Sequence, residues 1–192
     1  MQTSFYSEEE LRQLGLKSYG KDVMISKKCS FYSIENISVG NHVRIDDFCI
    51  LSGSIVIGNY VHISAYCALY GKYGIQLGDY SNLSPRCTLF SATDDFSGEH
   101  LVGSTIPMRF ICLRTGKINI ERMANVGAGT IIMPSVTINE GAAIGALSFV
   151  DRDIPSWTIW INKRQIISQY KQRLHTMNDF ATILDEDNNY NP

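Results

Sequence analysis

Large aliphatic residues return at every sixth position along two stretches of the chain. The second stretch starts at Ile120 and runs through Val126 and Ile132 to Val150. This interval matches neither the 3.6-residue period of an amphipathic α-helix nor the two-residue alternation of a strand in a plain sheet. The pattern therefore predicts a repeated structural unit. The complete set of positions is Val39, Ile45, Leu51, Ile57, Ile63, Leu69, Leu77, Leu83, Leu89, Ile120, Val126, Ile132, Ile138, Ile144 and Val150.

A short strand, a turn and another short strand explain the repeat, and three strands make one coil of about 18 residues. The aliphatic side chains then point into a triangular prism, and successive coils stack at the ~4.8 Å spacing of paired strands. Because alternate strand residues share a face, the residue four positions further on also points inward and should be small or medium in size. These positions are Val43, Cys49, Ile55, Val61, Cys67, Cys87, Ala124, Thr130, Val136, Ala142 and Ser148.

Glycine often follows the aliphatic residue, and Asn or Asp can follow the glycine. Because these residue types tolerate a positive φ, we expect them at the corners of the coil. The dipeptides are Gly40-Asn41, Gly58-Asn59 and Gly78-Asp79.

Three of the five cysteines fall at inward positions of this repeat. Cys49, Cys67 and Cys87 are each about one coil apart, so they are predicted to form an inward stack. Free buried thiols acting as small hydrophobic groups are the favoured interpretation, with a redox or metal role as the alternative. The cysteine spacing resembles no zinc site.

The stretch "VGAGTIIMPSVTINEGAAIGALSFVDRDIP" and the dozen repeats in register resemble the hexapeptide-repeat acyltransferases. Within them the chain is similar to the sugar O-acetyltransferases of the galactoside, maltose and polysaccharide type, and "SEEELRQLG" resembles the short N-terminal helix of that group. The resemblance implies a mainly β fold, a left-handed parallel β-helix. It also implies a homotrimer with active sites between neighbouring coils.

Three segments lie outside the coil. Residues 7–14 should form a short helix with a capping box between Ser7 and Glu10. The period fails over the loop insertion 90–117, and so long a loop is usually functional. We expect an N-terminal helical segment at 1–20, a β-helix domain at 21–155, and a C-terminal helix and tail at 156–192. Apolar residues at three/four spacing predict that the last helix packs on the coil: Ile166, Ile167, Tyr170, Leu174, Met177, Phe180, Ile183 and Leu184.

The resemblance implies transfer of an acetyl group from acetyl-CoA to a sugar hydroxyl, without a metal. A hydroxyl is a poor nucleophile at neutral pH and needs a base, most often His, within hydrogen-bond reach. In the resembled enzymes that His falls where this chain has Asp94, and an acceptor-side Asn falls on Tyr66. A carboxylate normally has a pKa of about 4, too low for an efficient base toward a hydroxyl. Asp94 and Asp95 therefore suit orienting a His or binding sugar hydroxyls, with direct action of Asp94 left open.

Two histidines are the candidate bases. His62 should point outward from a strand, with Asn82 at the same register one coil later. His100 lies on the loop insertion, near the place from which the resembled enzymes take their His. Tyr66 could stack a sugar ring, although an exposed tyrosine can equally pack at a subunit contact. His42, at a corner, and His175, in the C-terminal helix, are weaker candidates.

The CoA side matches the resembled enzymes better, since their pantetheine arm runs between coils against small residues. The matching positions are Gly127, Ala128, Gly145 and Ala146, with Asp151 further on. The alternative interpretation is that glycine and alanine suit the tight corners of the coil. The usual cation for the nucleotide phosphates is replaced by Ile166. Lys163 and Arg164 are the candidates to take over that role.

Composition and charge indicate which classes of partner the chain is suited to bind. The formal net charge is −2, so nothing indicates nucleic acid or an anionic membrane surface as a partner. No apolar run approaches the ~18 residues that span a bilayer, and the N-terminus lacks the features of a signal peptide. We therefore expect a cytoplasmic protein.

The favoured function is O-acetylation of a sugar by acetyl-CoA, with a nucleotide sugar or a polysaccharide precursor as acceptor. Amino-sugar N-acetylation on the same scaffold is the second enzymatic hypothesis. A non-catalytic β-helix that serves assembly or binding is the alternative from another class, because the fold alone does not decide the activity.

Overall fold

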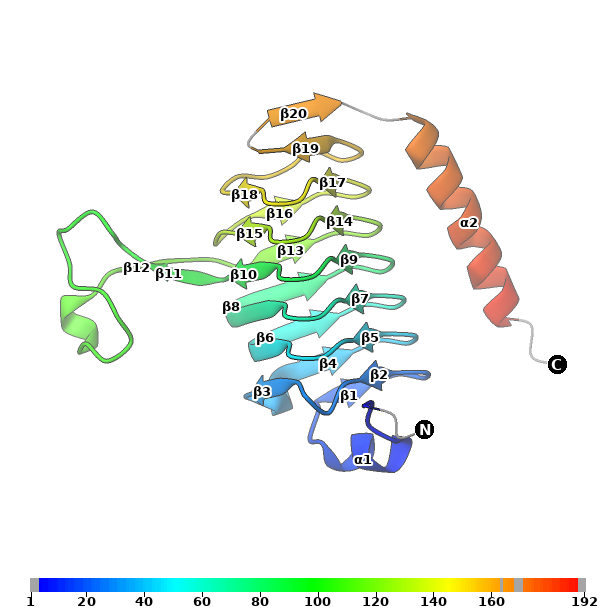
Figure 1. Ribbon diagram of the computed structural model, residues 1–192, viewed down its shortest axis with the longest axis horizontal. Coiled ribbons are helices and arrows are strands. Elements are labelled where there is room, and N and C mark those ends of the chain that lie inside the picture. The colour runs from blue at the N-terminus through cyan, green and yellow to red at the C-terminus, as the bar shows by residue number, and fades with distance from the viewer. Residues whose placement is uncertain (1–3, 163, 168–170, 190–192) are drawn as a thin grey trace.

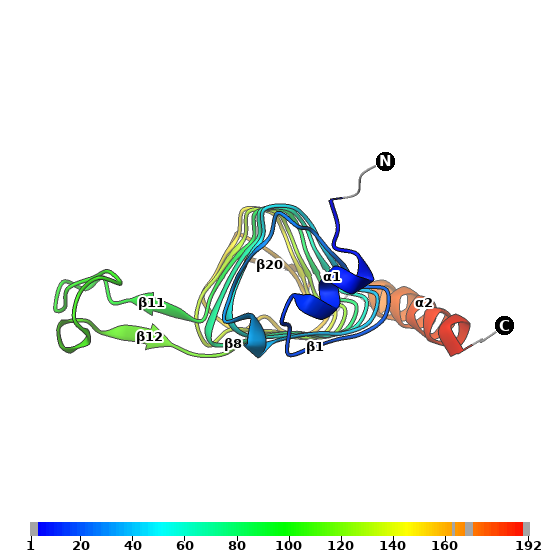
Figure 2. The same ribbon diagram turned by 90° about the horizontal axis from the view of Figure 1, so that it is seen from below.

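The computed structural model describes residues 4–162, 164–167 and 171–189, and its central part is a regular β-helix (Figure 1). Seen along its axis, the coil is a triangular prism with three faces and three corners (Figure 2). A projecting hairpin leaves one corner, and a C-terminal helix lies beside another. The mainly β, parallel coil expected from the six-residue period is confirmed.

One face of the prism is an eight-stranded sheet, which we call the β7 face. Its strands are parallel except for the last, which runs antiparallel to its neighbour. In spatial order they are β2 (Met24–Ile25), β5 (Arg44–Ile45), β7 (His62–Ile63), β9 (Asn82–Leu83), β14 (Asn125–Val126), β17 (Ala143–Ile144), β19 (Ile159–Ile161) and β20 (Arg164–Ile167).

The other two faces share a ten-stranded parallel sheet, because β6 (Ile50–Ile57) and β8 (Ala68–Leu77) each continue around a corner. Its register joins equivalent positions of the repeat, such as Leu51 with Leu69 and Leu69 with Leu89. The remaining strands are β1 (Ser18–Tyr19), β3 (Ser30–Tyr32), β4 (Ile37–Val39), β10 (Thr88–Phe90), β13 (Ile118–Ile120), β15 (Ile131–Ile132), β16 (Thr137–Ile138) and β18 (Phe149–Val150).

The predicted inward residues form the core. None of them exposes more than 4% of its surface. The stack of thiols is present, and Cys49 and Cys67 each donate to a backbone carbonyl at 3.2 Å. A hydrogen bond with Cys29 lowers the pKa of Cys49, but the hydrogen bond with Cys67 and burial outweigh it and raise that pKa to about 12. The Cys67 pKa is raised in the same way, so both thiols remain protonated and pack as small apolar groups.

The corner residues with a positive φ are not the ones we expected. At one corner they are His42, Tyr60 and Tyr80, with φ of 54°, 56° and 58°, each two positions after the glycine. Glycine is required for a different reason, since a Cβ there would lie less than 3 Å from backbone atoms of the next coil. The amide side chains tie neighbouring coils together, as when the backbone N–H of Asn41 donates to Asn59 Oδ1 at 2.8 Å.

The N-terminal helix α1 (Glu8–Gln13) is confirmed, together with its capping box. The backbone N–H of Glu10 donates to Ser7 Oγ at 3.3 Å, and the backbone N–H of Ser7 donates to Glu10 Oε2 at 2.7 Å. Two donors that the first turn leaves without helical partners are thereby satisfied.

The C-terminal helix α2 (Lys171–Asn189) begins later than predicted. Ile166 and Ile167 lie in β20, whose pairing with β19 overrides their helical spacing, and Tyr170 lies outside the described residues. None of the helices in the described part of the chain has the length and apolar composition needed to cross a bilayer.

The packing of α2 also differs from the prediction. Phe180 and Ile183, expected to face the coil, expose 63% and 51% of their surface. Instead, Ala181 is buried, and the Tyr80 hydroxyl donates to Asp185. The helix therefore lies against a polar corner of the coil, which the apolar periodicity could not indicate.

The loop insertion 90–117 contains regular structure. β11 (Ala92–Asp94) and β12 (Leu113–Thr115) pair antiparallel, and the short 3₁₀ helix η2 (Met108–Phe110) lies between them. We call residues 91–116 the projecting hairpin. Pairing its two strands satisfies backbone groups that extend beyond the coil.

The inward register makes a testable prediction at two neighbouring residues. Ile132 is fully buried, whereas Ile131 exposes 38% of its surface. Ile132→Ala should lower the free energy of unfolding by about 3 kcal/mol because it leaves a cavity in the prism, and Ile131→Ala by less than about 1 kcal/mol. Chemical denaturation measures both. Equal losses for the pair would contradict the register.

Candidate active site

The projecting hairpin carries a cavity of about 290 Å³. Asp94 lines it at the end of β11, where the backbone pairs with Leu113 of β12. Lys72 of β8 contributes an ammonium group, Thr93 and Ser104 contribute hydroxyls, and Met108 is part of the wall. The cavity therefore combines a half-buried carboxylate with hydrogen-bonding groups and apolar surface, a combination typical of small-molecule sites.

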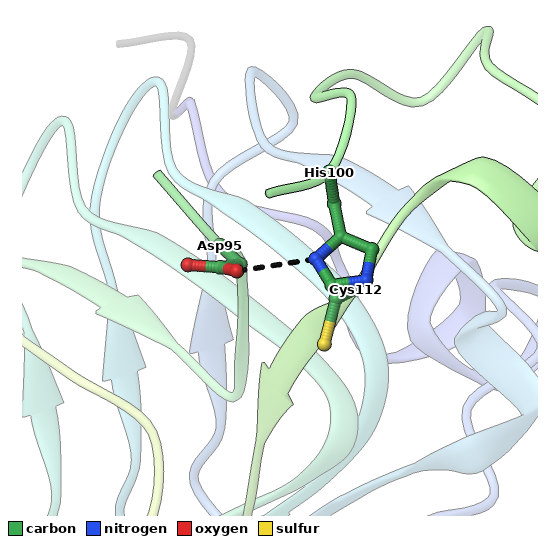
Figure 3. A group of neighbouring side chains, drawn as sticks. All are labelled: Asp95, His100 and Cys112. Atoms are coloured by element: carbon green, nitrogen blue, oxygen red, sulfur yellow. Dashed lines mark hydrogen bonds and ion pairs between the residues drawn. The ribbon is translucent and has the colours of Figure 1, made fainter. Parts of the chain in front are cut away.

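Asp95 and His100 form a second group on the hairpin (Figure 3). His100 Nδ1 lies 3.3 Å from Asp95 Oδ2. Ser97 holds the carboxylate in place, since its backbone N–H donates to Oδ1 at 2.9 Å and its hydroxyl to Oδ2 at 2.8 Å. These bonds to Ser97, together with His100, lower the pKa of Asp95. Neither Asp95 nor His100 is among the residues that line the cavity of Asp94.

His62 points outward from the β7 face, as predicted, and is oriented by a carboxylate. Its Nε2 lies 2.8 Å from Asp46 Oδ2, and Arg44 Nε donates to the other oxygen at 2.7 Å. Burial alone would raise the pKa of Asp46, but the hydrogen bonds from His62 and Arg44 outweigh it and lower that pKa. An imidazole held by an ionised carboxylate can act as a general base.

Asn82 lies beside His62 in the same sheet. Its Oδ1 is buried and accepts no hydrogen bond from the described part of the chain. The neighbouring Asn125, by contrast, donates through Nδ2 to the carbonyl of Met123 at 3.0 Å. Asn82 therefore carries a buried acceptor, unsatisfied within the described residues, on the strand that pairs with the strand of His62.

Tyr66 occupies a corner of the coil with a φ of 64° and exposes 54% of its surface. Its ring stacks on Phe48 at 5.0 Å between centroids, and the guanidinium of Arg86 lies 5.8 Å from the ring centre. The two rings form an exposed aromatic surface, and both roles considered for Tyr66 stay predictions.

The small residues predicted for CoA lie where coils meet. A Cβ on Gly127 would lie 2.5 Å from the backbone nitrogen of Ala146, and one on Gly145 would lie 2.8 Å from Ile161. The backbone N–H of Leu147 donates to the carbonyl of Ala128 at 2.8 Å. Coil stacking alone therefore requires Gly127 and disfavours a larger residue than Gly145 beside the Ile161 side chain. The role of both glycines toward CoA stays a prediction.

The other predicted CoA residues are separated from that corner. Asp151 follows β18, so the length of that strand lies between it and Gly145. Arg164 begins β20, but its side chain and the whole of Lys163 lie outside the described residues.

The remaining histidines are placed elsewhere. His42 stacks on Tyr60 at 4.6 Å, and its Nδ1 lies 3.4 Å from Asp22. His175 is exposed on α2. Neither lies with the candidate groups.

The candidate residues thus fall into two groups. His62 and Asn82 lie on the β7 face, whereas Asp94, Asp95 and His100 lie on the hairpin, which leaves the prism at a corner that the β7 face does not reach (Figure 2). Sequence spacing could place each residue on its coil but could not show which groups meet.

Comparisons with known proteins agree with this fold. The chain matches no protein-family model. It is 40% identical over 159 residues to the dTDP-4-amino-4,6-dideoxy-D-glucose acyltransferase of Escherichia coli, which covers 81% of this chain and 83% of that protein. It is 45% identical to AntD, an N-acyltransferase from Bacillus cereus, in its complex with dTDP and 3-hydroxybutyryl-CoA, with a TM-score of 0.91 over 96% of this chain and 100% of that one.

A hexapeptide-repeat acetyltransferase from Vibrio cholerae shares the fold at 18% identity and a TM-score of 0.55, over 84% of this chain and 75% of that one. The coil and the two more similar relatives thus define an acyltransferase of the β-helix class. At the identities above, the chain belongs to the family of the Escherichia coli and Bacillus cereus acyltransferases. The predicted β-helix fold of the hexapeptide-repeat acyltransferases is confirmed. The two more similar relatives, however, are named for an amino sugar or for N-acyl transfer, which matches our second enzymatic hypothesis better than the first.

The Asp46 carboxylate makes a pH-dependent prediction. Its pKa is lower in the folded chain, so its stabilisation is complete above the ordinary value of about 4 and is lost as the pH falls through the folded value. Asp46→Asn should lower the free energy of unfolding at pH 7 by about 1–2 kcal/mol. Its stability should also fall less than that of the wild type between pH 5 and pH 3.

The exposed Glu9 supplies the matched control, because Glu9→Gln removes a carboxylate without these partners. Urea unfolding at several pH values compares the three proteins. Parallel curves for wild type and Asp46→Asn would show that the pair with His62 does not form in solution.

Proposed function

We propose that this chain transfers an acyl group from a CoA thioester to the 4-amino group of dTDP-4-amino-4,6-dideoxyglucose or a closely similar nucleotide sugar. The Escherichia coli relative is named for this acceptor. A structure of the Bacillus cereus enzyme contains the same nucleotide sugar together with CoA, at 45% identity and a TM-score of 0.90. Relatives this similar over nearly the whole chain support a shared acceptor class.

Asp94 is the observation that carries the proposal. The sugar O-acetyltransferases that the sequence resembles place a His there, because a hydroxyl must give up its proton to a base of near-neutral pKa. An amine has a conjugate-acid pKa of about 8 when it resembles an α-amino group, so it is partly neutral at working pH. A carboxylate can bind its ammonium form through a charge-assisted hydrogen bond and receive a proton from it. An aspartate therefore fits an amine acceptor better than a hydroxyl.

Variants of the Bacillus cereus enzyme support the same residues. They include changes at a serine numbered 84 and an aspartate numbered 94. This chain has Ser84 and Asp94 at those numbers, and we take them as the equivalent positions. Ser84 follows β9, and its backbone N–H donates to the carbonyl of Val126 at 2.9 Å. It is thus stacked next to Gly127, where the resemblance places the pantetheine arm.

The proposed reaction uses these groups as follows. The neutral amine attacks the thioester carbonyl, a C–N bond forms, and the carbonyl oxygen gains negative charge. The C–S bond then breaks, the nitrogen loses a proton, and the CoA sulfur takes one up. Asp94 holds the amine and accepts its proton, while Ser84 and backbone N–H groups of the coil contact the reacting thioester.

The residues proposed to bind CoA are those predicted from the sequence, whereas the acyl group of the donor is less restricted. Gly127, Ala128, Gly145 and Ala146 are proposed to lie along the pantetheine arm, and Lys163 and Arg164 to serve the phosphates. Acetyl-CoA was the expected donor, but a complex of the Bacillus cereus enzyme contains 3-hydroxybutyryl-CoA. We therefore propose that the donor is a CoA thioester. The comparison of acetyl-CoA with 3-hydroxybutyryl-CoA described below identifies the preferred acyl group.

The site is proposed to form between copies of a homotrimer, as the resemblance implies. The hairpin of one copy would cover the β7 face of its neighbour and bring Asp94 toward Ser84 and His62. The exposed apolar side chains of Leu101, Val102 and Phe110 on the hairpin support this arrangement, because such a contact would bury them. A molar mass of one chain in light scattering would contradict it.

The choice of acceptor can be tested directly. The purified chain is incubated with acetyl-CoA or 3-hydroxybutyryl-CoA and either the 4-amino nucleotide sugar or its analogue with a 4-hydroxyl group. Mass spectrometry should detect an acylated product from the amine at a rate at least about 100-fold above that from the hydroxyl, because Asp94 is a poor base for the latter. Faster product formation from the hydroxyl would restore the O-acetyltransferase hypothesis, and no product from any pair would favour the non-catalytic one.

The role of Asp94 gives a second test. Asp94→Asn should lower kcat/KM by about 10²–10³-fold at pH 7. Part of that loss should be recovered toward pH 9, where the free acceptor amine is already neutral. Glu99→Gln, on the exposed part of the same hairpin, is the control and should leave kcat/KM within about twofold. A uniform loss at every pH would show that Asp94 does not handle the amine proton.

A further inference from the structure

A thiol, an imidazole and a carboxylate converge on the projecting hairpin, outside the cavity of Asp94. The ligand atoms of Asp95, His100 and Cys112 all lie within 4.8 Å of one another (Figure 3). This is the one such group of three that the described residues contain. Its three members come from different segments: the residue after β11, the turn beyond it, and the residue before β12.

The backbone of the hairpin holds the three residues together. The backbone N–H of Asp95 donates to the carbonyl of Cys112 at 2.9 Å. Leu101, next to His100, donates to the carbonyl of Phe110 at 2.9 Å and forms a bridge with Ile111, next to Cys112. Both bonds fix neighbouring residues, so the three side chains are positioned by the fold and not by their mutual attraction.

Cys112 differs from every other cysteine of the chain. Cys49, Cys67 and Cys87 are buried in the prism, and Cys29 is half-buried with its thiol donating to the carbonyl of Asp46 at 3.2 Å. Cys112 is exposed. A thiol that is open to solvent and lies beside an imidazole and an ionised carboxylate is available as a metal ligand.

We propose that Asp95, His100 and Cys112 bind a zinc ion that joins the three segments of the projecting hairpin. Zn²⁺ takes one sulfur, one nitrogen and one oxygen ligand readily, with a water molecule in the fourth position of a tetrahedron. Bond lengths of about 2.0–2.3 Å require only small movements from the present spacing. Zn²⁺ would displace the thiol proton and replace the contact between His100 Nδ1 and Asp95.

Ser97 would orient the Asp95 carboxylate toward the ion without binding the ion itself. Its backbone N–H and hydroxyl already donate to the two oxygens of Asp95, and such bonds orient a metal-binding carboxylate. Asp94, Ile111 and Leu113 line the cavity, whereas their neighbours Asp95 and Cys112 do not. The ion would therefore stabilise the wall of that cavity without entering it. This inference does not depend on the proposed function.

Cobalt serves as the probe, because Co²⁺ replaces Zn²⁺ and its spectrum reports the ligands. The full chain is stripped with a chelator, kept reduced, and titrated with Co²⁺. We expect one ion to bind per chain. The spectrum should show a thiolate-to-cobalt charge-transfer band in the near ultraviolet, together with visible absorption bands of the high intensity typical of tetrahedral Co²⁺. Added Zn²⁺ should remove these bands at equimolar concentration.

Variants locate the site. Cys112→Ser should abolish the charge-transfer band, and His100→Gln or Asp95→Asn should weaken Zn²⁺ binding by at least about 100-fold. Ser97→Ala should weaken it by about 10–100-fold. Cys29→Ser and His42→Gln are the matched controls and should bind as the wild type does. Circular dichroism confirms that each variant is folded.

A second readout follows the hairpin itself. Equimolar Zn²⁺ should slow tryptic cleavage after Arg109 in the wild type but not in Cys112→Ser. No charge-transfer band at equimolar Co²⁺, a band that survives Cys112→Ser, or cleavage that Zn²⁺ leaves unchanged would each overturn the proposal.

Discussion

The stacking of one coil on the next is the constraint on which the rest of the structure depends. Each coil donates backbone hydrogen bonds to the coil that follows, as when the N–H of Arg44 bonds to the carbonyl of Val61 at 2.9 Å. This places equivalent residues directly above one another, so a side chain that faces inward in one coil meets its counterpart in the next. The aliphatic core, the thiol stack and the amide ladder at the corner all follow from that register. A shift of the register by one residue in any strand would turn the side chains of that strand to the opposite face.

The same constraint separates structural from functional residues. Gly127 cannot carry a Cβ, because backbone atoms of the neighbouring coil would lie less than 3 Å from it, and a Cβ on Gly145 would crowd the side chain of Ile161. Glycine at these two positions is thus explained before any ligand is considered. Asp94 has no such role in the coil, since it lies on the projecting hairpin, and His62 faces outward from a strand. Residues that stacking does not explain are therefore the better guide to the chemistry of this family.

The sequence predicted the coil because its periodicity repeats many times with the same physical cause. Ile132 and Cys67 could be placed in the core from spacing alone. The failures concern features that depend on single contacts. The positive φ of Tyr60 follows from the geometry of the turn and not from residue preference, and Phe180 is exposed because α2 packs through polar contacts. The site was harder still, since His100, Asp95 and Cys112 are brought together by hairpin pairing that the sequence of the 28-residue insertion did not reveal. The role proposed for Ser84 likewise left no periodic signal.

The projecting hairpin enters and leaves the coil without disturbing it. β10 pairs with β15 and β8 pairs with β13, so the ladder continues across the excursion as if the intervening residues were missing. Its length and contents are therefore largely decoupled from the stability of the solenoid. Such an insertion can be replaced by another while the β-helix is kept. Evolution or protein engineering could therefore change the residues that the hairpin presents without redesigning the coil.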